Sequence, residues 1–144
     1  MQAIIIGVWI TQAIITFLDE FIFHHKRGLG RWERIGHPVD TIFFLVPFIY
    51  TQIFTSELVF IILCILSSLL VTKDEFVHSK ECEGLENFLH ALLYLIHPVA
   101  LYGLWLAWKN DMNFIIQIQS IIIFVYLCYQ MIYWNFYKGK NNEA

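Results

Sequence analysis

Two stretches of the chain carry most of the side chains that could bind a metal ion. They are "DEFIFHHKRGLGRWERIGHPVD", residues 19–40, and "DEFVHSKECEGLENFLH", residues 74–90. In each, Asp-Glu-Phe is followed by a histidine and then by Glu-x-x-x-His, so the same order of residue types occurs twice. Imidazole and carboxylate ligands together suit iron, manganese or zinc, whereas calcium and magnesium prefer oxygen ligands alone. The repeated pattern predicts a metal site built from two similar halves.

The spacing of these residues fits helices, because residues three or four apart lie on one helical face. Four carboxylate and imidazole pairs meet this condition, and we predict their eight members as metal ligands: Glu20/His24, Glu33/His37, Glu75/His78 and Glu86/His90. Five further residues are expected to support these ligands or to add to them: Asp19, Asp40, Asp74, His97 and His25. Whether Asp19 or Glu20, and whether Asp74 or Glu75, faces the site stays open at this stage. We assign no catalytic residue.

The elements that must position these ligands are hydrophobic helices. The chain has 144 residues, of which 58% are hydrophobic and 15% charged, with a mean hydropathy of +0.61, which is typical of a membrane protein. The apolar runs cover residues 3–18, 41–54, 58–71, 88–108 and 114–136. A spanning helix needs about 20 residues, so some runs must include their polar flanks.

We therefore predict an all-α integral membrane protein with one domain, residues 1–144, and about five transmembrane helices. Helices 1–2 (about 3–55) and 3–4 (about 57–108) form a parallel two-fold internal repeat, and an extra helix covers about 113–136. Four helices are the alternative, if the second and third form a shallow hairpin. The first run has neither a basic leader nor a small-residue cleavage motif, so it is expected to stay as a helix.

The distribution of Lys and Arg predicts the orientation in the membrane. With five spans, one side holds Lys26, Arg27, Arg31, Arg34, Lys73, Lys80, Lys138 and Lys140, and the other side holds only Lys109. Cytoplasmic loops are enriched in these residues. We expect a multi-pass protein of a bacterial inner or plasma membrane, with both polar loops and the C-terminus cytoplasmic and the N-terminus outside. The cations of the loops are interpreted as topology determinants at the interface.

The ligand inventory is similar to that of ferritin-like di-iron carboxylate proteins, which use two Glu-x-x-His motifs and two further glutamates. Glu75-Phe76-Val77-His78 matches such a motif, whereas the other three pairs are Glu-x-x-x-His. The resemblance therefore implies ligand types and not that fold. Eight candidate ligands exceed the four of a structural zinc site, so we expect two metal ions, iron first and zinc or manganese as alternatives.

The leading functional hypothesis is a small membrane metalloenzyme, an oxidoreductase or oxygenase acting on a lipid-like or membrane-soluble substrate at the cytoplasmic face. One alternative is a zinc-dependent hydrolase of a lipid amide or ester. Another is a protein without catalysis, either a metal carrier or sensor or a structural membrane protein. Membrane lipid and a hydrophobic small molecule are the expected partners, with a homo-oligomer and an electron donor as further candidates and no nucleic acid.

Overall fold

The described part of the chain is all-helical. A computed structural model describes residues 1–74 and 84–137 and contains no strand in these ranges. The five main helices are α1 (Gln2–Leu18), α3 (Arg31–Ile53), α4 (Glu57–Leu70), α6 (Gly84–Lys109) and α7 (Asn113–Ile132). The prediction of an all-α fold is confirmed. The predicted internal repeat stays a prediction, because most of the second polar segment lies outside the described residues.

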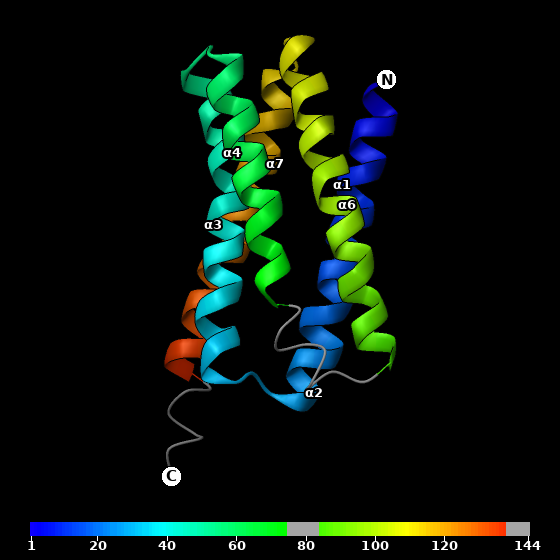
Figure 1. The fold of residues 1–144 in the computed structure, drawn as a ribbon, viewed down its shortest axis with the longest axis vertical. Coiled ribbons are helices and arrows are strands. Elements are labelled where there is room, and N and C mark those ends of the chain that lie inside the picture. The colour runs from blue at the N-terminus through cyan, green and yellow to red at the C-terminus, as the bar shows by residue number, and fades with distance from the viewer. Residues whose placement is uncertain (75–83, 138–144) are drawn as a thin grey trace.

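The helices form a bundle whose long axes run roughly side by side (Figure 1). α1 packs along α6, and α3 packs against both α4 and α7. The contact between α1 and α6 centres on Trp9, whose indole Nε1 donates a hydrogen bond to the Ala100 carbonyl at 3.0 Å. The Trp9 ring also packs against Phe48 of α3, with ring centroids 5.5 Å apart. Trp9 thus joins three helices in the core.

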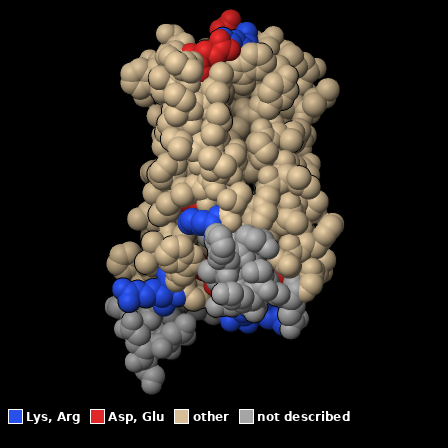
Figure 2. Space-filling view, in the orientation of Figure 1, with Lys and Arg blue, Asp and Glu red and all other residues tan. Residues whose placement is uncertain are grey.

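Three helical stretches are long and apolar enough to cross a membrane: Gln2–Arg27, Gly84–Lys109 and Asn113–Tyr137. α4 has 14 residues, fewer than the roughly 20 that a span requires. α3 is longer, at 23 residues, but contains Asp40 and several polar residues. On the face drawn in Figure 2, an uncharged belt separates charged groups at the two ends of the bundle. These features are compatible with a membrane protein.

The N-terminal helix changes its geometry where it reaches the polar segment. α1 continues into a π-helical turn, η1 (Asp19–His24), and then into one α-helical turn, α2 (His25–Arg27). Gly28 ends this stretch with φ +81°, a conformation that a residue without a side chain adopts easily. α3 begins three residues later, at Arg31, and its Glu33 side chain accepts a hydrogen bond from the Gly30 backbone N–H at 3.0 Å, as in a helix capping motif.

The last helix, α7, also ends in a π-helical turn. α7 continues into a second π-helical turn, η3 (Tyr133–Tyr137), in which Trp134 is buried. α4 is followed by a 3₁₀ turn, η2 (Val71–Asp74). Both π-helical turns lie at the end of the bundle that carries α2, opposite the N-terminus (Figure 1). Such turns are rare and occur frequently at functional sites.

Candidate metal centre

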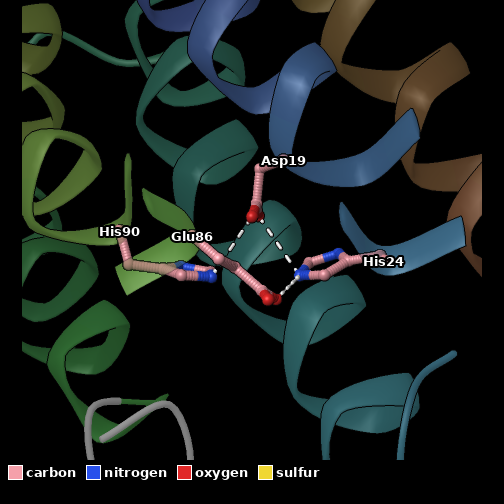
Figure 3. Close-up of side chains that lie close together, drawn as sticks. All are labelled: Asp19, His24, Glu86 and His90. Carbon is pink, nitrogen blue, oxygen red and sulfur yellow. Dashed lines mark ion pairs between the residues drawn. The ribbon is translucent and has the colours of Figure 1, made fainter. Parts of the chain in front are cut away.

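Four buried side chains from two helical segments converge at this end of the bundle. Asp19 and His24 come from η1, and Glu86 and His90 come from the first turns of α6 (Figure 3). Each offers one ligand atom, and the four atoms all lie within 4.8 Å of one another. None of these residues is more than 4% exposed. A group of two imidazoles and two carboxylates, shielded from water, could hold a metal ion.

The distances within this group resemble the edges of a coordination polyhedron. Asp19 lies 3.3 Å from His24 Nε2 through one carboxylate oxygen and 3.2 Å from His90 Nε2 through the other. Glu86 Oε1 lies 3.8 Å from His24 Nε2. Donor atoms placed tetrahedrally around an ion at about 2.1 Å stand roughly 3.4 Å apart. His24 Nε2 is buried and makes no hydrogen bond within the described residues, although a carboxylate oxygen of Asp19 and one of Glu86 lie within 3.8 Å of it.

The π-helical turn explains why Asp19 and Glu20 both point inward. In an α-helix, Glu20 and His24 share a face, but Asp19 and His24 are five residues apart and do not. A π-helical turn pairs residues five apart, which brings Asp19 onto the side of His24 while Glu20 stays there. Asp19 and Glu20 are 4% and 1% exposed. The sequence left open whether Asp19 or Glu20 faces the site, and in the structure both do.

A second group lies on the other side of the same histidine. It consists of Glu20, His24 and His37, again with ligand atoms within 4.8 Å of one another. His24 Nδ1 lies 3.4 Å from Glu20 Oε2, and the rings of His24 and His37 meet edge to face with centroids 4.7 Å apart. His24 thus presents one ring nitrogen to each group. This arrangement could place one ion on each side of the His24 imidazole.

Glu20 is held by two aromatic residues of the C-terminal helix. Trp134 Nε1 donates a short hydrogen bond to Glu20 Oε1, and the Tyr126 hydroxyl donates to Glu20 Oε2 at 3.3 Å. Hydrogen bonds to a carboxylate fix its orientation and are stronger than those between neutral groups. The second π-helical turn, which contains Trp134, therefore supports the site formed by the first.

Replacing Trp134 with phenylalanine should weaken metal binding about tenfold, the lower end of the effect of removing a residue that orients a ligand. The reason is that Glu20 loses the indole donor while the aromatic volume is largely kept. Equilibrium dialysis against a chelator of known affinity measures the change. Trp32→Phe is the matched control, because Trp32 is 58% exposed and lies outside both groups. Equal metal affinity of the two variants would contradict the role given to Trp134.

Arg27 binds two of the predicted ligands at once. Its guanidinium donates to both carboxylate oxygens of Glu33, at 2.6 and 3.0 Å, and to Glu86 Oε1 at 3.1 Å. Its side chain is 22% exposed. Arg27 is thus a partly buried clamp that joins α2 to α3 and α6. Glu86 Oε1 is shared between this clamp and the four-residue group.

The remaining predicted residues lie apart from the two groups. Glu33 belongs to the Arg27 clamp and to the cap of α3. Asp40 forms an ion pair with Lys73 at 2.6 Å, and His97 Nε2 shares a hydrogen bond of 2.9 Å with Ser67 Oγ. The His25 ring packs against Tyr133 at 4.8 Å. Asp74 closes η2, but its side chain is not described, and Glu75 and His78 lie outside the described residues.

A cavity of about 250 Å³ adjoins the ligand groups. It lies among α1, α3, α6 and α7, and Asp19, His37 and His90 contribute to its wall. The rest of the wall is mainly apolar and aromatic, including Trp9 and Phe44. Ligand sites are typically apolar hollows with a few converging polar groups. The candidate metal centre is therefore open to a small molecule on its inner side.

Sequence reasoning missed three supporting residues, Arg27, Tyr126 and Trp134. The sequence shows of Arg27 and Trp134 only that they lie near the ends of apolar runs, which indicates an interfacial position and no role in a site. Tyr126, in the middle of an apolar run, carries no pattern that would single it out. Their roles depend on long-range packing, since both aromatic partners of Glu20 are more than 100 residues away.

Comparison with known proteins finds no protein-family model that matches this chain, and no curated protein or solved structure matches it either. The candidate metal centre is therefore supported by its geometry alone.

Proposed function

We propose that this protein is a multi-pass membrane metalloenzyme whose site lies at the cytoplasmic face. The surface supports the membrane assignment, because many large apolar side chains along the helices are more than half exposed, among them Ile4, Leu58, Leu95 and Phe114. In water such a surface would be an aggregation hazard. Cations gather at the end of the bundle that carries the site, where Arg27 and Lys73 lie, which supports a cytoplasmic location of that end.

The proposed topology has five spans, with α3 and the short α4 crossing together with the three long helices. The parallel repeat would pair α1 and α3 with α4 and α6. Its support is the origin of the ligands: Asp19 and His24 come from the first polar segment, and Glu86 and His90 come from the second. A site at the interface of two repeats takes ligands from both.

The metal is proposed to be iron. The single observation that carries the proposal is the buried group of Asp19, His24, Glu86 and His90, with two imidazoles and two carboxylates within 4.8 Å. Two histidines and a carboxylate with open positions are the ligand set of non-haem iron(II) oxygenases. The Glu20, His24 and His37 group would take a second ion. Manganese or zinc could occupy the same ligands, and elemental analysis of the purified protein separates the three metals.

The proposed reaction is the oxidation of a membrane-soluble molecule bound in the adjoining cavity. In an oxygen-dependent hydroxylation, one oxygen atom of O₂ enters a C–H bond of the substrate and the other leaves as water. Two electrons and two protons from an external donor complete the balance. This chain would bind and orient the substrate through the cavity, and its carboxylates and imidazoles would hold the iron.

Oxygen consumption by iron-loaded protein tests this function. Protein purified without a histidine tag is dialysed anaerobically against iron(II) and placed in lipid nanodiscs. Ascorbate free of dithionite is added as the electron donor and decan-1-ol as the substrate probe, and the sample is then exposed to air. We expect oxygen uptake that depends on iron and on the alcohol. Tight zinc binding with oxygen-independent hydrolysis of an alkyl ester would move the assignment to a zinc hydrolase. Metal binding without either activity would contradict catalysis and favour a carrier or sensor.

A further inference from the structure

We propose that the cavity beside the metal centre binds the single apolar chain of an amphiphile, which enters sideways from the membrane between α1 and α7. The chain would have on the order of ten carbon atoms, and its polar end would lie at Asp19 and His90. This inference rests on the proposed function in one respect, which is that the bound molecule is the substrate. The binding itself is a separate property of the fold.

The walls of the cavity indicate the orientation of the ligand. Asp19, His37 and His90 lie at the end that adjoins the ligand groups. Trp9 and Gln12, which are further along α1 toward the N-terminus, line it as well. The cavity therefore extends from the metal centre further into the bundle, along apolar and aromatic side chains interspersed with polar ones such as Gln12 and Gln119. A molecule with one polar end and an apolar body would match both parts.

The opening of the cavity lies between α1 and α7. Ala13, Phe17 and Phe21 follow one another at four-residue intervals on α1 and its π-helical extension, and all three line the cavity. Ile122 and Tyr126 line it from α7 with the same spacing. Phe17 and Ile122 are 56% and 52% exposed, although they also border the hollow. Side chains that are exposed and line the cavity mark its mouth, and in the proposed topology this mouth faces lipid.

The volume limits what can enter. A cavity of about 150 Å³ can hold one benzene molecule, so the 250 Å³ found here corresponds to roughly ten carbon atoms on the same scale. A phospholipid with two long acyl chains is therefore too large to be enclosed. A single medium-length chain fits, with its hydroxyl or carbonyl group at Asp19 and His90.

Photoaffinity labelling tests this inference. The probe is a ten-carbon primary alcohol with a diazirine at its far end, used on protein in dioleoyl phosphatidylcholine nanodiscs. With the hydroxyl group at Asp19, the diazirine should label Trp9 or Gln12 on α1 and Gln119 on α7, as mapped by mass spectrometry. Decan-1-ol should compete with the labelling, and hexadecan-1-ol should compete less well, because the longer chain exceeds the cavity.

Two matched variants locate the mouth. Ala13→Phe should reduce labelling about tenfold, the loss expected when about two methylene groups of the chain no longer fit. Ile14→Phe adds a similar ring to the next residue, which is 53% exposed and does not line the cavity, so its labelling should equal that of the unaltered protein. Equal labelling of both variants, or labelling spread over outward residues such as Ile10, would overturn the inference.

Labelling of protein with and without metal separates this inference from the proposed function. Specific labelling that persists after metal removal supports the cavity even if the iron assay fails. Loss of specific labelling in protein that still binds metal overturns the inference and leaves the metal centre intact. Retained metal in Ala13→Phe, measured on the same sample, shows that this variant is folded at the site.

Discussion

Replacing His24 with alanine is expected to lower metal affinity by more than about a hundredfold, beyond the effect of losing a residue that only orients a ligand. His24 is the one residue common to both candidate groups, and it is fully buried. Its loss removes a nitrogen from each group, and both Asp19 and Glu20 lose an imidazole that lies within 3.4 Å of their carboxylates. Equilibrium dialysis with iron(II) or zinc, followed by elemental analysis, measures the loss.

His25→Ala is the control for this variant. His25 is the next residue in the chain, and its ring packs against Phe21, Tyr133 and Trp134, but it belongs to neither group. The control should therefore keep its metal. Circular dichroism and gel filtration in detergent show whether each variant is folded. Unchanged metal content in folded His24→Ala would mean that the metal binds elsewhere and that the two groups around His24 are not its site.

The second large effect is expected from Arg27→Met, which should destabilise the protein by about 3 kcal/mol, the lower end of the range for breaking a buried ion pair. The lower end applies because Arg27 is 22% exposed and water screens part of the interaction. Methionine keeps much of the aliphatic volume but leaves the buried carboxylates of Glu33 and Glu86 without their guanidinium. Unfolding in mixed micelles with increasing dodecyl sulfate gives the free energy change.

Two further variants show whether charge causes this loss. Lys26→Met removes the neighbouring, exposed cation and should change stability by no more than about 0.5 kcal/mol. Arg27→Met combined with Glu33→Gln should recover part of the stability, because an amide is less costly to bury than a carboxylate. If Arg27→Met behaves like Lys26→Met, the clamp contributes nothing to stability and its proposed role is wrong.

Most of the helices could be predicted from the sequence, because the apolar residues are grouped into runs. The five runs each correspond to one main helix. The helices extend further than the runs at the polar end, since α3 begins at Arg31 and α6 at Gly84. Those extensions contain Glu33 and Glu86, whose burial depends on partners in other helices. Hydropathy alone cannot show that a polar turn is buried.

The candidate site was accessible only in part, and the reason is the local helix geometry. The spacing of four between Glu20 and His24, and between Glu86 and His90, places each pair together, as the structure does. Asp19 joins them through a π-helical turn, which no spacing rule for α-helices contains. Glu33 has the same spacing to His37, but it is engaged by Arg27 and by the cap of α3. Equal spacing therefore gives candidate ligands in one pair and a structural carboxylate in another.

The metal content of the purified protein decides whether the buried carboxylates and imidazoles form a metal centre. The protein is made without a histidine tag and without added metal, purified in detergent, and analysed for iron, zinc, manganese and copper per chain. We predict iron, with one ion for the four-residue group and a second when the Glu20, His24 and His37 group is filled. Protein that contains no metal, and that takes none up from iron(II), zinc or manganese solutions, would mean that the buried side chains do not form a metal centre.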